Sequence, residues 1–149
     1  MPGSGAKPSA SEGEIRAIID ARVEAVRAKD VRAAMSYHQP DAVLFDVIEP
    51  LRYMGASAAK KRAEEWFSSF EGPLGYEIRE LNVTAGDSVA FSYGLNHVKG
   101  TKMNGGELDM WWRATVCYQK IDGKWAITHE HGSVPFDATS GKASLDLKP

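Results

Sequence analysis

The stretch Met110-Trp-Trp-Arg-Ala-Thr-Val-Cys-Tyr118 is predicted to form one β-strand with both faces covered. Alternate side chains of a strand point to opposite faces, and every second residue from Met110 onward is apolar. The other face is mixed and carries Trp111, Arg113, Thr115 and Cys117. A face in contact with water would not normally carry tryptophan, so we expect one face inside the protomer and the other against helices, a ligand space or a second subunit. The sequence therefore predicts a homodimer.

Further strands flank this one, and helices precede them all. Runs rich in β-branched and aromatic residues, separated by turn residues, predict strands at 75–83, 88–99, 108–119 and 125–134. Apolar residues at helical spacing predict helices at 12–28, 31–39 and 57–70, with a broken strand over 42–54. Ser11 and Glu14 form a capping box for the first helix. This order is typical of an α+β fold, in which a mostly antiparallel sheet wraps over helices on one side.

Composition restricts the class of protein. The 149 residues include 18 basic and 20 acidic ones, and no basic run exceeds Lys60-Lys61-Arg62, so we expect no nucleic-acid partner. A signal peptide and a membrane span are not expected, and the single Cys117 allows no internal disulfide, which together predict a cytoplasmic protein. One domain is expected over 11–136, with a disordered lead-in at 1–10 and a loose tail at 137–149.

Near the end of the last strand, His129 and His131 are two residues apart and share a face with Trp125. Such a pair is often only a hydrogen-bonded, half-buried pair. With Asp46 as a third ligand it would have the composition of a facial metal triad, but the spacing is a weak signal and we expect no metal.

The strand pairing of these histidines depends on the turn at 122–123. A two-residue turn would set His129 opposite Val116. A three-residue turn with a left-handed glycine in a bulge would instead set the two histidines opposite Thr115 and Arg113. We favour the second register, because it gathers the polar groups at one end of an apolar wall, as in a small-molecule pocket.

Two segments resemble the SnoaL-like branch of the nuclear transport factor 2-like superfamily. The run 41–46, Asp-Ala-Val-Leu-Phe-Asp, resembles the first-strand motif of ketosteroid isomerases. The run 129–136, His-Glu-His-Gly-Ser-Val-Pro-Phe, after Asp-Gly-Lys-Trp at 122–125, is similar to SnoaL-like proteins and to the association domain of calcium/calmodulin-dependent kinase II. The resemblance extends over residues 12–136. It implies three helices and a strongly curved sheet around a pocket open at one end, with the sheets of two protomers packed together.

The resemblance also implies roles for individual residues. Asp46 falls where ketosteroid isomerases keep the general base that moves a proton between carbons next to a carbonyl. Their oxyanion donors are a tyrosine on the first helix and a protonated aspartate on a late strand. Arg22 and Thr115 stand at about these places here, so steroid isomerisation itself is not implied unless Arg113 or the histidines replace the donors.

Two functions therefore stay open. The first is a cofactor-free isomerase, cyclase or dehydratase that acts on an apolar carbonyl compound, and the second is a non-catalytic ligand-binding or dimerisation module. In the enzyme, Asp46 is the general base and either histidine is the acid or oxyanion donor. The residues expected to bind substrate are Arg113, Thr115, Trp66, Tyr93 and Trp111. A cavity at Asp46 would favour the enzyme, whereas a salt-bridge partner and no cavity would favour the module.

Overall fold

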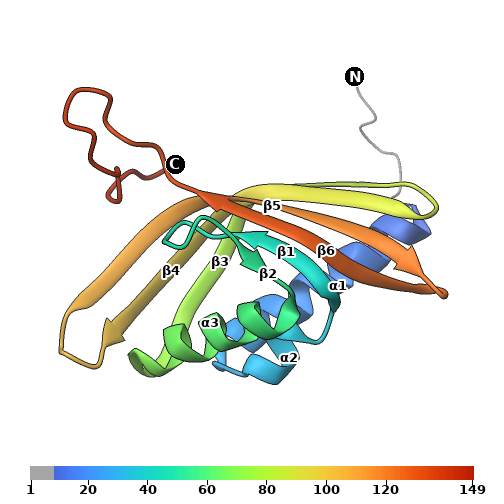
Figure 1. Cartoon of the computed structure of the whole chain (residues 1–149), viewed down its shortest axis with the longest axis horizontal. Coiled ribbons are helices and arrows are strands. Elements are labelled where there is room, and N and C mark those ends of the chain that lie inside the picture. Colours follow the sequence, from blue (N-terminus) through green and yellow to red (C-terminus); the bar gives the residue numbers. More distant parts are fainter. Residues whose placement is uncertain (1–8) are drawn as a thin grey trace.

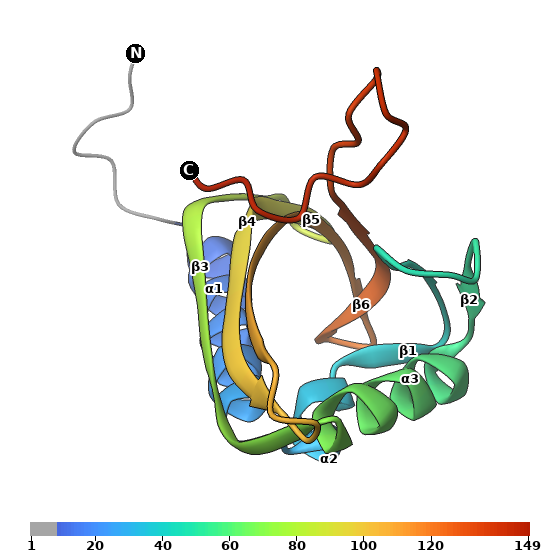
Figure 2. The same ribbon diagram turned by 90° about the vertical axis from the view of Figure 1, so that its left-hand side faces the viewer.

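A curved six-stranded sheet with three helices on one side makes up the protein, as the computed structural model of residues 9–149 shows (Figures 1 and 2). The helices are α1 (Ala10–Arg27), α2 (Val31–Met35) and α3 (Ala56–Ser68). The strands are β1 (His38–Phe45), β2 (Tyr53–Met54), β3 (Phe70–Ala85), β4 (Val89–Lys102), β5 (Glu107–Ile121) and β6 (Lys124–Ser133). Their order in the sheet is β2-β1-β6-β5-β4-β3, and β1 and β6 alone pair in parallel. This confirms the predicted α+β fold.

Two apolar clusters hold the helices on the sheet. The first packs α1 against β3 to β6 and contains the buried residues Ile15, Ile18, Ile19, Val83, Ala90, Tyr118, Trp125 and Ile127. The second packs the end of α1, α2 and α3 against the other end of the sheet and contains Ala25, Ala34, Phe67, Phe70, Leu74 and Val98. Each fully buried large side chain stabilises the fold by about 1.5–3 kcal/mol. The helices therefore cover one face of the sheet, which we call the helix-side face.

The start of α1 differs from the prediction. Ser9 is the N-cap and its hydroxyl accepts a hydrogen bond from the Glu12 backbone N–H, so the predicted capping box of Ser11 and Glu14 is wrong. Both Ser9 and Ser11 precede a glutamate by three residues, and sequence spacing alone does not separate them. The predicted lead-in at 1–10 lies outside the described residues except for its last two, which begin the helix.

Strand pairing also moves two other boundaries. β1 begins at His38 rather than at residue 42, because the Ile127 N–H donates to the Tyr37 carbonyl and draws this segment along β6. The helix predicted over 57–70 ends at Ser68, because Phe70 already pairs with Lys102 of β4. Both changes come from long-range pairing, which local patterns do not report.

The β5–β6 register corrects the prediction. Asp122 and Gly123 both have positive φ angles, so the turn has two residues, and Ile121 pairs with Lys124. An extra residue, Thr128, then bulges out of β6, since Tyr118 pairs with Ile127 but Cys117 pairs with His129. The partner of Thr115 is His131 and that of Arg113 is Ser133. Neither register considered from the sequence is correct.

The bulge reverses the faces of β6 beyond Thr128. His129 and His131 lie with Cys117 and Thr115 on the sheet's outer face, opposite to Trp125 and Ile127. Glu130 takes the helix-side face instead. The expected gathering of polar side chains on one face is therefore found, but on the face turned away from the helices.

The chain leaves the sheet after β6 (Figures 1 and 2). The predicted tail, 137–149, is folded back in its first part, because the Asp137 N–H donates to the Lys142 carbonyl and the Ser144 N–H to the Pro135 carbonyl. None of the helices described in residues 9–149 is long and apolar enough to cross a membrane.

Candidate functional site

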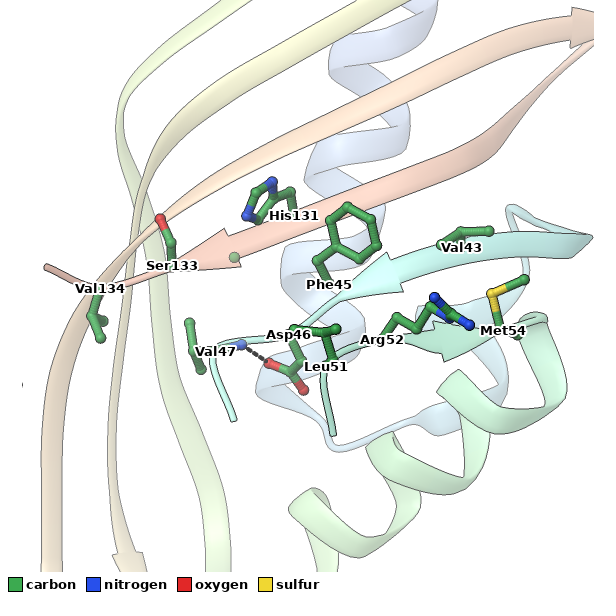
Figure 3. Close-up of a pocket in the computed structure, with 11 residues that line it drawn as sticks. Val43, Phe45, Asp46, Val47, Leu51, Arg52, Met54, His131, Ser133 and Val134 are labelled. Carbon is green, nitrogen blue, oxygen red and sulfur yellow. Dashed lines mark hydrogen bonds between the residues drawn. The ribbon is translucent and has the colours of Figure 1, made fainter. Parts of the chain in front are cut away.

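An open hollow of about 810 Å³ lies where β1 ends beside β2 and the last residues of β6 (Figure 3). Its lining is mostly apolar: Val43, Phe45, Val47, Leu51, Met54, Gly132 and Val134. Four polar side chains join them, Asp46, Arg52, His131 and Ser133. An apolar wall with a few convergent polar groups is the usual make-up of a small-molecule site.

Asp46 follows the last residue of β1 and turns toward α3. One carboxylate oxygen accepts from the Val47 backbone N–H at 2.7 Å, and the other accepts from Nε of Arg62 at 3.2 Å. The side chains of Asp46 and Arg62 are 29% and 19% exposed, so the ion pair is reached by water at one side. Arg113, which was expected to bind substrate, is on the outer face and donates to Ser133 Oγ.

The two histidines differ in their surroundings. His131 lines the hollow, with its ring edge-on to Phe45 at 5.3 Å. His129 also packs edge-on against Phe45, and its Nδ1–H donates to the Val43 carbonyl at 2.7 Å. Only Asp46 and His131 among the predicted catalytic residues line the same hollow.

The predicted substrate-binding residues do not line it. Tyr93 and Thr115 pair across β4 and β5 on the outer face, where Tyr93 stacks on Phe91. Trp111, also on that face, stacks on His97. Trp66 belongs to the second apolar cluster, where it packs against the neighbouring phenylalanines of α3 and β3.

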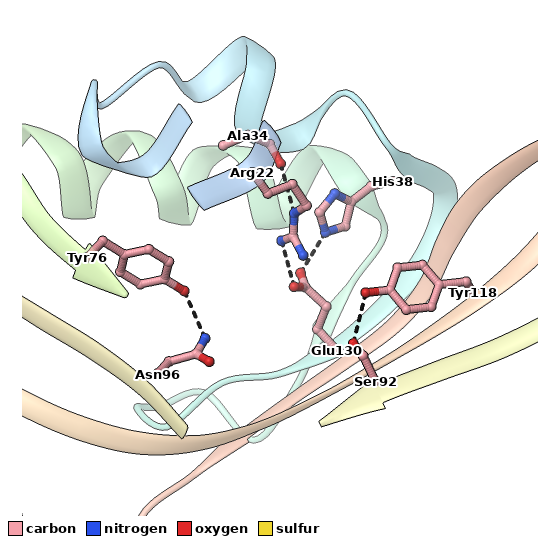
Figure 4. Close-up of polar contacts among 8 residues, drawn as sticks. All are labelled: Arg22, Ala34, His38, Tyr76, Ser92, Asn96, Tyr118 and Glu130. Carbon is pink, nitrogen blue, oxygen red and sulfur yellow. Dashed lines mark hydrogen bonds and ion pairs between the residues drawn. The ribbon is translucent and has the colours of Figure 1, made fainter. Parts of the chain in front are cut away.

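A partly buried ion pair occupies the helix-side face (Figure 4). Arg22 of α1 donates through Nη2 to Oε1 of Glu130 at 2.6 Å, and Nε2 of His38 lies 2.6 Å from the other oxygen. Burial by itself would raise the pKa of the Glu130 carboxyl, but the charge of Arg22 and the hydrogen bond from His38 outweigh it and hold that pKa well below its usual range. The carboxylate is therefore ionised and carries two strong contacts.

Two neutral hydrogen-bonded pairs flank the ion pair. The Asn96 side-chain amide donates to the Tyr76 hydroxyl at 2.8 Å. The hydroxyl groups of Ser92 and Tyr118 form a hydrogen bond with 2.9 Å between their oxygens. Burial raises the pKa of Tyr76 to about 12, although the charge of Arg22 opposes this. Tyr76 is thus a protonated hydroxyl at neutral pH.

Sequence reasoning missed Arg62 and Glu130. Arg62 stands among Ala59, Ala63 and Trp66 on the apolar stripe of α3, and a charged residue in such a stripe was the available signal. Arg22 interrupts the stripe of α1 in the same way. For Glu130 no local signal existed, because the bulge that turns it toward the helices is not marked by glycine or proline.

Other chemistry has less support. Burial raises the pKa of the Cys117 thiol, which makes it a poorer nucleophile. Within the part of the chain that the structure describes, no three His, Cys, Asp or Glu side chains are arranged to hold a metal ion.

Comparison with known proteins agrees with the fold. A SnoaL-like domain matches residues 15–137. The chain belongs to the SnoaL-like family. This SnoaL-like protein has no match among curated proteins. A solved NTF2-like protein of unknown function from Pseudomonas putida KT2440 is 34% identical, with a TM-score of 0.86 over 95% of this chain and 99% of the other.

Two more distant structures share the fold of this SnoaL-like protein. A ketosteroid isomerase-like protein from Erwinia carotovora atroseptica is 20% identical, with a TM-score of 0.72 over 85% of this chain and 97% of the other. The association domain of calcium/calmodulin-dependent kinase II from C. elegans is 16% identical, with a TM-score of 0.63 over 83% and 95%. The SnoaL-like match and the 34% identical NTF2-like protein confirm the suspected membership of the nuclear transport factor 2-like superfamily.

Proposed function

We propose that this protein is a cofactor-free enzyme that binds a mostly apolar carbonyl compound and moves a proton on it, as an isomerase, cyclase or dehydratase does, with Asp46 as the general base. The observation that carries the proposal is the carboxylate of Asp46 in the wall of a mostly apolar hollow. Its two hydrogen bonds, from Val47 and Arg62, fix the position of both oxygens. A fixed carboxylate beside an apolar ligand is suited to proton abstraction.

In the proposed step, a carboxylate oxygen of Asp46 takes a proton from the carbon next to the carbonyl. The C–H bond breaks, its electron pair forms the C=C bond of an enolate, and the carbonyl oxygen becomes negative. The proton returns from Asp46 to the same carbon or to a second one. His131, which lines the hollow, is the side chain proposed to donate to the developing charge or to a leaving hydroxyl.

A second candidate function is ligand binding without turnover. The ion pair between Asp46 and Arg62 favours it, because Arg62 occupies one of the two carboxylate oxygens that a base would use. In either function we propose a homodimer formed through the outer face. Exposed large side chains there support it, with exposed fractions of 60% for Val89, 41% for Phe91 and 49% for Tyr93.

Exchange of the α-protons of 2-tetralone in D₂O, followed by proton NMR, tests the proposed proton transfer. This bicyclic ketone is apolar and has acidic protons beside its carbonyl. We expect the protein to accelerate the exchange. The rate of exchange catalysed by Asp46→Asn should be at least about 100-fold lower than the rate catalysed by the unsubstituted protein. The matched control is Asp41→Asn, the same change at an exposed carboxylate of β1, the strand that Asp46 follows.

The two candidate functions give different outcomes. Saturable binding of the ketone with no acceleration in the unchanged protein would support the ligand-binding module and reject the enzyme. Acceleration that is equal in Asp46→Asn and Asp41→Asn would reject Asp46 as the base.

A further inference from the structure

Arg52 is a cation in the wall of the hollow that the proposed proton transfer does not use. Among the residues that the structure describes, 9–149, it takes part in no ion pair. Asp46 is the acidic side chain of the lining within this range, and it is already paired with Arg62. The wall therefore presents a guanidinium whose charge has no counter-ion among the described residues.

The register of three strands sets Arg52 in a row with Phe45 and His131. Leu44 pairs with Tyr53 in the antiparallel pair of β1 and β2, so the next step sets Phe45 opposite Arg52. On its other side, Phe45 pairs with His131 of β6. Directly opposed residues of neighbouring strands share a face, so the three side chains lie on the outer face. All three are part of the lining of the hollow (Figure 3).

This row has an aromatic centre and a polar group at each end. Neighbouring strands are about 4.8 Å apart, so the backbones of Arg52 and His131 are about 10 Å apart with Phe45 between them. The His131 ring is edge-on to Phe45, with 5.3 Å between the ring centres. An apolar ring system that covers Phe45 would therefore have the guanidinium at one end and the imidazole at the other.

The surroundings of Arg52 suit a ligand that is apolar and anionic at once. Leu51 and Met54, which also line the hollow, are 89% and 62% exposed, so the apolar body of a ligand would remove them from water. A guanidinium binds a carboxylate through two parallel N–H···O bonds. Arg62 neutralises Asp46, so a carboxylate at Arg52 meets little repulsion from that side.

We infer that Arg52 binds a carboxylate of the ligand, and that the apolar body of this ligand lies over Phe45. The inference rests on the proposed function, because it concerns the same hollow and narrows the substrate class to an apolar carbonyl compound that also carries a carboxylate. In that class, Arg52 determines specificity and takes no part in the proton transfer itself. Arg113, the cation expected from the sequence to bind substrate, does not have this role, because it lies outside the lining.

Equilibrium binding at pH 7, measured by NMR titration, tests the carboxylate site without any turnover. The probes are 2-naphthoate and 2-naphthamide, which have the same rings but a charged and a neutral end group. We expect 2-naphthoate to bind about fivefold more tightly, the upper limit for one ion pair that water reaches, and Arg52→Gln to abolish this preference. The matched control is Arg32→Gln, which changes an exposed arginine of α2 outside the lining and should keep the preference.

Each outcome decides the inference separately from the proton transfer. Equal dissociation constants for the two probes, or no saturable binding of 2-naphthoate, would overturn the carboxylate site even if Asp46→Asn abolishes proton exchange. A preference for 2-naphthoate that persists in Arg52→Gln would also overturn it, because the carboxylate would then bind elsewhere. Conversely, a preference that only Arg52→Gln removes would support the carboxylate site even if the protein does not accelerate the exchange of 2-tetralone.

Discussion

Removing the charge of Glu130 should destabilise the protein far more than removing an exposed charge. In Glu130→Gln, Arg22 keeps its burial and loses its anionic partner, and His38 loses an ionic acceptor. Breaking a fully buried ion pair costs about 3–5 kcal/mol. Because each side chain of the Arg22 pair is 21% exposed, we place the loss near the lower limit, at about 3 kcal/mol.

Urea unfolding followed by tryptophan fluorescence, at pH 7 and one protein concentration, measures this loss. The matched control is Glu24→Gln, which breaks the pair of Glu24 with Arg27, where the two side chains are 71% and 45% exposed. Exposed pairs contribute about 0–1 kcal/mol, so this variant should remain close to the unchanged protein. Equal free energies of unfolding for the two variants would refute the role assigned to Glu130.

The same pair gives a pH dependence of known sign. The pKa of Glu130 is held below its usual range in the folded protein, whereas an unfolded glutamate titrates near about 4.3. Its stabilising contribution is therefore complete above that unfolded pKa and is lost as the pH falls toward the folded pKa, at up to about 1.4 kcal/mol per pH unit. The difference in unfolding free energy between the unchanged protein and Glu130→Gln should narrow from pH 5 to pH 3. A constant difference would contradict the assignment.

Two further predictions concern the sheet. Tyr93→Glu on the outer face should convert the proposed homodimer to a monomer, as measured by sedimentation at micromolar concentration. If the protein without any substitution already sediments as a monomer, the proposed dimer is rejected. Gly94→Ala should lower the free energy of unfolding by about 1–3 kcal/mol, because the added Cβ would lie 2.8 Å from Ile78 Cγ2 and 3.2 Å from the Arg79 carbonyl oxygen. A urea titration measures the change. An unchanged urea midpoint would contradict the prediction and show that β3 moves to accommodate the methyl group.

The order and type of the elements could be predicted from the sequence because each has a clear local pattern. The apolar spacing of Ile15, Ile18 and Ile19 identified α1, and alternation identified β5. The turn at 122–123 was also marked correctly as a turn. The three-residue turn favoured for it is wrong, since aspartate and glycine also fit the two-residue turn that the structure has.

The candidate site was predicted less completely because the faces of its β6 residues depend on one bulge. With Thr128 inserted, His129 and His131 change faces and Glu130 turns inward, so alternation along β6 gives the wrong face for all three. Asp46 was found because it lies in a motif shared with a known family. Its partner Arg62 comes from a helix far along the chain, and only the folded structure brings the two together.

The central claim is that the Asp46 carboxylate carries a proton between carbons of an apolar carbonyl compound. Its most direct test is the rate constant kcat for deuterium exchange into 2-tetralone in Asp46→Asn, measured together with the dissociation constant of the same ketone. We predict that kcat falls at least about 100-fold while the dissociation constant changes less than about threefold, because asparagine fills the same space but cannot take up the proton. A kcat within about threefold of the unchanged protein, with normal binding, would contradict the claim.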